Sequence, residues 1–182
     1  MPKNTPRKPT ATATATATVK GALAGAVEAV AKRMPGTDTD ALTLLETDHR
    51  RLEDLLANGE DTTETAVKTR RTLLKTITSE LTTHEMLEEK LLYPALEGHP
   101  ETRAIALEGF QEHHVADVLL KELHGVPAGN ELWAAKFKVL KENLEHHIEE
   151  EEGTMFRTAR GVMNREELAA LGARMLKMKA RR

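Results

Sequence analysis

The chain has 182 residues, with 29 acidic and 26 basic side chains, 8 histidines and no cysteine. This length suits one domain of average size with a tail. The lack of cysteine excludes a disulfide scaffold, a thiolate zinc site, an iron–sulfur cluster and a cysteine nucleophile. A net charge of −3 disfavours nucleic-acid binding by the whole chain, and no apolar run is long enough to span a membrane. Abundant Leu, Ala, Glu, Lys and Arg predict an all-α fold.

Residues 1–36 predict a disordered, flexible tail that is basic and rich in Ala and Thr. Four Ala-Thr repeats follow a stretch of Pro, Lys and Arg, and no acidic residue precedes Glu28. A segment of this composition cannot bury a core. Three alternatives stay open: residues 1–20 could be an organelle transit peptide, the tail could weakly hold nucleic acid or another acidic partner, and residues 19–33 could form a short helix. Without a transit peptide, the expected location is the cytoplasm.

Residues 37–160 predict four helices separated by clear breakers. Gly59, Pro94 and Gly125 are expected to end the first three. The predicted helices cover residues 38–58, 63–92, 101–124 and 131–157. Short connections between long helices make neighbours antiparallel, so the predicted architecture is an up-down-up-down four-helix bundle. Residues 161–182 predict a short C-terminal helix that opens with a capping box.

Polar residues continue the apolar face of these helices. In the first helix, His49 follows Leu45 by four residues and precedes Leu52 by three, so all three share one face. The second helix continues its face with His84 and Glu88. These groups therefore occupy positions that would otherwise belong to the core. A buried carboxylate without a partner costs on the order of several kcal/mol, and a metal ion can neutralise several such groups together.

The third and fourth helices each offer two adjacent histidines, and an internal repeat chooses between them. His84 is followed by glutamates at +4 and +5 and by Leu and Tyr at +8 and +9. His147 is followed by glutamates at +4 and +5 and by Met and Phe at +8 and +9. An acidic residue precedes both His49 and His113, and the leucine spacing after them matches. The first two helices therefore look like a copy of the last two, and the copy selects His113 and His147 as the inward-facing members.

The pattern predicts a site for two metal ions. Histidine at i and glutamate at i+4 share one helix face, one turn apart. Imidazole and carboxylate together suit iron, manganese or zinc better than calcium or magnesium. A catalytic zinc takes three protein ligands, so six suit two ions with bridging glutamates. The predicted metal ligands are His49, His84, Glu88, His113, His147 and Glu151. Glu85 and Asp117 stay open as additional ligands.

The segments DHRRLEDLL, HEMLEEKLLYPAL, EHHVADVLLKEL and HHIEEEEGTMF resemble the hemerythrin-like family, also called the HHE cation-binding domain, over residues 40–160. The resemblance implies that the same six residues ligate two iron ions (Fe2+ or Fe3+, with an oxo bridge as one option). It also implies a small ligand such as oxygen, nitric oxide or peroxide. Two positions depart from the family pattern. Asp117 stands where oxygen-carrying hemerythrins have a histidine, and Arg157 stands where many relatives have proline. The first departure weakens the oxygen-carrier role more than metal binding.

The expected function is therefore that of a hemerythrin-like non-haem di-iron protein in binding, sensing or stress protection, and no catalytic residue is predicted. Three alternatives remain: a di-iron oxidase or peroxide-consuming enzyme, an iron-responsive interaction module, and a metal-free structural bundle. A ferritin-like protein is disfavoured because that fold needs Glu-x-x-His on two helices. Here only Glu46 and His49 have this spacing.

Overall fold

The computed structural model describes residues 39–181, and within that range it contains helices and no strand. The elements in chain order are α2 (Ala41–Glu60), α3 (Val67–Leu87), the π-helix η1 (Glu88–Leu92), α4 (Tyr93–Leu96), α5 (Pro100–His124), α6 (Glu131–Glu150), the π-helix η2 (Glu151–Met155), α7 (Phe156–Val162) and α8 (Arg165–Lys179). The expected all-α fold is confirmed. The predictions for residues 1–36 lie outside the described residues.

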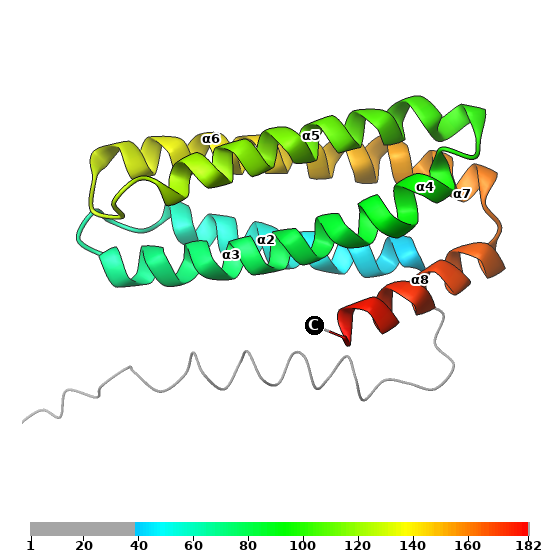
Figure 1. Cartoon of the computed structure of the whole chain (residues 1–182), viewed down its shortest axis with the longest axis horizontal. Helices are drawn as coiled ribbons and strands as arrows, with labels where there is room; N and C mark the ends of the chain where they lie inside the picture. The colour runs from blue at the N-terminus through cyan, green and yellow to red at the C-terminus, as the bar shows by residue number, and fades with distance from the viewer. Residues whose placement is uncertain (1–38, 182) are drawn as a thin grey trace, which may run out of the picture. The chain divides into compact units, whose positions relative to one another are not determined.

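Helices α2, α3, α5 and α6 form a four-helix bundle, and short loops join neighbours that run in opposite directions (Figure 1). Helix α2 packs against α3 and α6, and α5 packs against α6. Helix α8 turns back across the end of the bundle and packs against α2. None of the described helices is long and apolar enough to cross a membrane.

Side-chain caps fix where several of these helices begin. Asp40 accepts a hydrogen bond from a backbone N–H in the first turn of α2, and Asn130 does the same for α6. The predicted capping box opens α8, with Asn164 and Glu167 each accepting from the other's backbone N–H. Such caps satisfy donors that have no partner inside the helix, and each contributes about 1 kcal/mol.

The second predicted helix does not stop at Pro94, as the sequence had suggested. It continues through η1 into α4, which ends at Leu96. Pro94 lies in the first turn of α4, directly after the π-helical segment, where a missing N–H and a fixed φ are tolerated. The fourth predicted helix likewise continues through η2 into α7. The two π-helices begin at Glu88 and Glu151, which are both predicted metal ligands, and π-helical segments often accompany functional sites.

Two hydrophobic clusters fill the interior. One lies at the α8 end of the bundle and includes Leu45 and Phe156. The other lies toward the opposite end and includes Leu52 and Trp133. His49 is on α2 between Leu45 and Leu52, so the predicted polar layer lies between two apolar ones.

Buried Arg70 ties the loops together at the end away from α8. Its guanidinium lies 4.5 Å from the centre of the Trp133 ring. It also donates to the backbone carbonyls of Ala128 and Thr62, each at 2.9 Å. A buried arginine is tolerated only when its donors are paired, and here they hold two inter-helix loops. The sequence reading did not single out this residue.

Candidate metal centre

The structure brings all six predicted ligand residues together inside the bundle, and none is more than 3% exposed. They are His49 on α2, His84 on α3, Glu88 on η1, His113 on α5, His147 on α6 and Glu151 on η2. The adjacent histidines, His114 and His146, are exposed.

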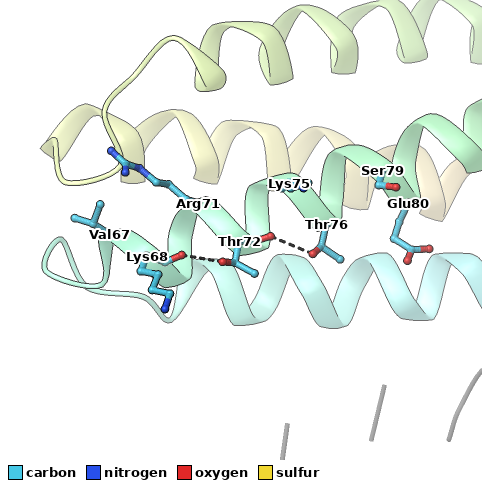
Figure 2. A pocket seen from close by; sticks show the side chains of 8 residues that line it. All are labelled: Val67, Lys68, Arg71, Thr72, Lys75, Thr76, Ser79 and Glu80. Carbon is cyan, nitrogen blue, oxygen red and sulfur yellow. Dashed lines mark hydrogen bonds between the residues drawn. The ribbon is translucent and has the colours of Figure 1, made fainter. Parts of the chain in front are cut away.

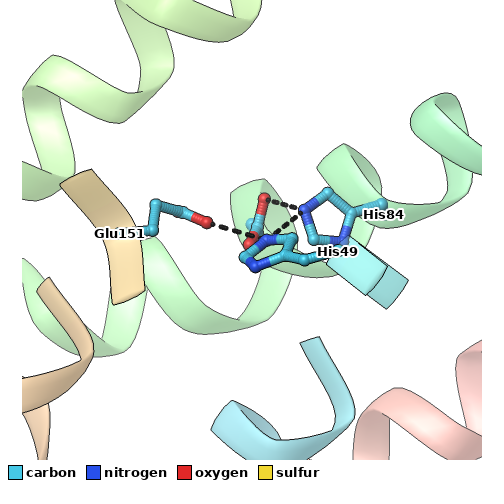
Figure 3. Close-up of side chains that lie close together, drawn as sticks. His49, His84 and Glu151 are labelled. Carbon is cyan, nitrogen blue, oxygen red and sulfur yellow. Dashed lines mark hydrogen bonds and ion pairs between the residues drawn. The ribbon is translucent and has the colours of Figure 1, made fainter. Parts of the chain in front are cut away.

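The four imidazoles form two pairs. The Nε2 atoms of His49 and His84 lie 3.1 Å apart, and those of His113 and His147 lie 3.3 Å apart. Figure 3 shows the first pair together with Glu151, whose carboxylate points toward His49 from the opposite side. Each pair combines one residue from each of two neighbouring helices in the same half of the bundle.

Each glutamate spans both pairs. Glu88 Oε2 lies 3.2 Å from Nε2 of His84 and 3.2 Å from Nε2 of His113. Glu151 Oε2 lies 3.2 Å from Nε2 of His49 and 3.7 Å from Nε2 of His147. The two carboxylates are therefore placed as bridges between two positions that each contain two imidazoles.

A ring of outer carboxylates orients the histidines. The Nδ1–H of His49 donates to Glu152 at 2.8 Å, and that of His147 donates to Glu112 at 2.7 Å. For His113 the acceptor is Glu89, at 3.1 Å. An imidazole that donates from Nδ1 presents the lone pair of Nε2 inward when it is neutral. Such carboxylates hold ligand histidines in one orientation and raise their basicity.

His84 is the exception in this ring. Its outer carboxylate is Asp48, whose Oδ2 lies 4.0 Å from His84 Nδ1, and Nδ1 has no hydrogen-bond partner. The sequence reading missed all four outer carboxylates. The repeat contained the signal, because Asp48 and Glu112 directly precede the first histidine of each half. Glu89 and Glu152 directly follow the glutamate of each half.

The unpaired atoms at the centre fit a metal. Neither oxygen of Glu88 has a hydrogen-bond partner, and neither does Oε2 of Glu151. Inward-facing imidazole lone pairs and carboxylate oxygens are all acceptors, so they cannot satisfy one another. Buried polar atoms are normally paired, and cations with affinity for both nitrogen and oxygen would pair with all of them.

Burial and neighbouring charges push the pKa values of the two glutamates apart. Burial, followed by the charge of Glu151, raises the pKa of Glu88 well above its usual value. Burial also opposes ionisation of Glu151, but the imidazoles of His147 and His49 outweigh it and hold that pKa below its usual value. Burial lowers the pKa of His84 to about 4. Without a cation, the centre therefore favours one protonated and one ionised glutamate.

Tyr93, which follows the second predicted histidine by nine residues, reaches the centre. Its hydroxyl donates to Glu151 Oε1 at 2.8 Å and lies 3.1 Å from Nε2 of His113. Its counterpart in the repeat, Phe156, stacks on His49 with ring centres 5.8 Å apart. The hydroxyl is therefore a polar contact that only one half of the centre has.

Glu85 and Asp117, the two open candidates, do not join the two buried groups of converging side chains, which among residues 39–181 consist of the six predicted residues. Asp117 is exposed. Glu85 is 6% exposed and its Oε1 has no hydrogen-bond partner. Burial, followed by the charge of Asp117, raises the pKa of Glu85 to about 8. A further group, made by Glu112, His146 and Glu150, lies at the surface.

Two hollows on the surface lie away from the centre. One follows the outer face of α3 and is lined by Val67, Lys68, Arg71, Thr72, Lys75, Thr76, Ser79 and Glu80 (Figure 2). The other lies beside Trp133 and Phe137, at the end of the bundle away from α8. None of the six predicted ligands lines either hollow, so neither gives a bulky substrate access to the centre.

Comparisons with known proteins agree with this geometry. The family model of the hemerythrin HHE cation binding domain matches residues 40–159. The chain therefore belongs to the hemerythrin HHE cation-binding domain family. A solved structure of a hemerythrin HHE cation binding domain-containing protein from Mycobacterium kansasii superposes with a TM-score of 0.69 and 26% sequence identity. The match covers 78% of this chain and 86% of that one. Among curated proteins, none matches the chain.

Proposed function

We propose that the protein binds two iron ions at this centre. One position would be held by His49 and His84, the other by His113 and His147, with Glu88 and Glu151 shared. The observation that carries the proposal is the convergence of six buried side chains whose inward atoms include unpaired carboxylate oxygens. Mixed imidazole and carboxylate ligands suit iron, and the family is one of cation-binding domains.

The role proposed for the centre is to bind a small ligand such as oxygen, nitric oxide or peroxide, in sensing or stress protection. Bound iron would supply electrons and a coordination position for that ligand. The chain's own contribution is to exclude water with the two hydrophobic clusters and to offer the Tyr93 hydroxyl as a hydrogen-bond donor. The two hollows away from the centre favour a small ligand over the bulky substrate of an oxidase.

Metal analysis and optical spectra test this proposal. Protein reconstituted anaerobically with Fe2+ should contain two iron ions per chain, and its spectrum should change on exposure to oxygen, nitric oxide or peroxide. His113→Ala should bind fewer than two iron ions per chain, whereas His114→Ala, a change at the adjacent exposed residue, should keep both. No iron uptake by the parent protein, or equal uptake by both variants, would contradict the proposal. Sustained peroxide turnover would instead identify a peroxide-consuming enzyme.

A second candidate function is an iron-responsive interaction module, because α8 is linked to the centre. Lys179 of α8 donates to both oxygens of Asp48, the outer carboxylate next to His84. A metal that repositions His84 would act on the same carboxylate that anchors α8. Hydrogen exchange of residues 165–179 with and without iron tests this idea, and identical exchange in both states would exclude it.

A further inference from the structure

The inner residues of the two halves correspond one to one, although Glu151 Oε2 lies 3.2 Å from Nε2 of His49 and 3.7 Å from Nε2 of His147. The charges just outside these residues differ between the halves. In the half with His49 and His84, each outer carboxylate is paired with a lysine or arginine side chain. Arg50 forms an ion pair and hydrogen bond with Glu152, the acceptor for His49. Lys179 Nζ lies 2.6 and 2.7 Å from the two oxygens of Asp48.

In the other half, the described part of the chain places no such cation. Among residues 39–181, no lysine or arginine forms an ion pair with Glu89 or Glu112, the acceptors for His113 and His147. The repeat explains the difference. The counterpart of Arg50 is His114, and Lys179 lies on α8, which has no second copy.

A cation on an outer carboxylate weakens its effect on the metal position. The carboxylate draws the imidazole proton toward itself and makes Nε2 a stronger donor. A lysine or arginine bound to the same carboxylate cancels much of its negative charge and also repels a metal cation directly. For His84 the effect is larger still, since both oxygens of Asp48 accept from Lys179 and Nδ1 of His84 has no hydrogen bond.

We propose that Arg50 and Lys179 are positioning residues that make the two metal positions unequal, so that a divalent cation binds more tightly between His113 and His147 than between His49 and His84. This inference rests on the proposed function, because it assumes that both positions take a metal. It predicts an order of loading. The position between His113 and His147 fills first, and the position between His49 and His84 fills second.

Titration of metal-free protein with Co2+ tests this order, with calorimetry and the visible absorption of bound Co2+ as readouts. Two binding events are expected in the parent protein. His113→Ala should remove the tighter event, and His49→Ala should remove the weaker one. These two variants assign each event to a half of the centre without reference to any activity.

Variants of the two cations then test the cause. Arg50→Gln and Lys179→Gln should each tighten the weaker event about three- to ten-fold, with little change in the tighter one. Arg51→Gln is the matched control for the first, because Arg51 pairs with Glu80 at 2.9 Å instead. Lys177→Gln, an exposed change on the same helix, is the control for the second. Arg50→Gln leaves α8 untouched, so it tests the inference even where Lys179→Gln loosens that helix.

The outcomes separate the inference from the proposed function. Two events of equal affinity in the parent protein would overturn the inference and leave metal binding intact. Loss of the weaker event in His113→Ala, or equal shifts of both events in Arg50→Gln, would also overturn it. If Co2+ uptake is instead unchanged in both His84→Ala and His113→Ala, the metal does not bind at this centre, and the proposed function fails first.

Discussion

The two halves of the bundle, α2 with α3–η1 and α5 with α6–η2, are copies that agree at the centre and differ around it. His49 corresponds to His113, His84 to His147 and Glu88 to Glu151, and both π-helices begin at the glutamate. The outer carboxylates correspond as well. Each of Glu89 and Glu152 crosses to a histidine of the other half. The predicted ligand set is therefore shared between the halves, and neither half contains all of it.

The differences lie one layer further out. Corresponding residues around the centre differ in polarity, charge or size, among them Tyr93 and Phe156, Glu85 and Ile148, Arg50 and His114, and Leu45 and Gly109. Gly109 leaves room for the hydroxyl of Tyr93. A Cβ at Gly109 would lie 2.7 Å from the Tyr93 hydroxyl, closer than real side chains allow. Substitutions around a duplicated centre can thus make its two halves unequal while the six predicted ligands stay the same.

The largest expected contrast is between the two central glutamates. In metal-free protein, burial and the charge of Glu151 hold the pKa of Glu88 well above its usual value, whereas the pKa of Glu151 is held below its usual value. Glu88→Gln should therefore change the free energy of unfolding little or raise it. Glu151→Gln removes the partner of His147 and His49 and should lower the free energy of unfolding by about 3 kcal/mol or more. Urea denaturation of chelator-treated protein measures both values.

The same two variants should behave alike once metal is present. Both remove a shared carboxylate, so both should lose most of the stabilisation that iron gives, on the order of 3–4 kcal/mol at metal concentrations of 100 to 1,000 times the dissociation constant. Equal effects of the two substitutions in the metal-free state would contradict the assignment of opposite protonation states.

Glu85 and its counterpart Ile148 predict a difference in pH dependence. The pKa of Glu85 is raised to about 8 in the folded chain, from a usual value of 4.5. The folded state therefore holds a proton that the unfolded state releases. The stability that this group contributes is complete below about pH 4.5 and is lost as pH rises through 8. The free energy of unfolding of the parent protein should fall by a few kcal/mol between pH 5 and pH 9, and Glu85→Gln should not show this fall.

The measurement is the free energy of unfolding of metal-free protein across this pH range. Glu149→Gln, at an exposed position on α6, is the control, since it removes the same charge at the surface. If the parent protein and Glu85→Gln show parallel pH profiles, Glu85 ionises normally in the folded chain.

Helix α8 packs mainly against α2, and Gly172 allows its close approach. A Cβ at Gly172 would lie 2.7 Å from the carbonyl oxygen of Thr39 and 2.9 Å from the backbone nitrogen of Ala41. Because both neighbours are backbone atoms, Gly172→Ala should cost about 1–3 kcal/mol and speed hydrogen exchange in α8. Gly161→Ala on α7, where nothing lies within 4 Å, should be neutral or slightly stabilising. Equal melting temperatures for the two variants would show that α8 does not depend on this contact.

The sequence predicted the bundle because its signals were local and strong. Helical spacing of leucines and well-placed breakers identify the four helices of the bundle. The capping box at Asn164 identifies the start of the C-terminal helix, α8. The repeat also chose the two histidines that the structure buries, His113 and His147, although their role as metal ligands stays a prediction. Periodicity succeeds here because it reports which residues share a face.

The sequence could not predict features that depend on where separate helices meet. Lys179 and Asp48 are far apart in the chain, and only the path of α8 brings them together. Arg70 is buried because two loops supply backbone carbonyls for its guanidinium. The helix runs through Pro94 because a π-helical segment precedes it, and no composition rule marks that segment. Tertiary contacts override local signals at each of these places.

The smallest expected effect concerns the hydroxyl that only one half has. Tyr93→Phe makes this position match Phe156 and removes one hydrogen bond to Glu151. Loss of a single buried hydrogen bond should lower the free energy of unfolding by about 1 kcal/mol, because the ring itself stays packed. The reciprocal change, Phe156→Tyr, should give no gain. Phe156 packs in the cluster in which Leu45 takes the place of Gly109, so an added hydroxyl has less room. Urea denaturation of both variants and of the double exchange measures these effects. Full recovery of stability in the double exchange would mean that the two positions are interchangeable, and that the hydroxyl does not distinguish the two sides of the centre.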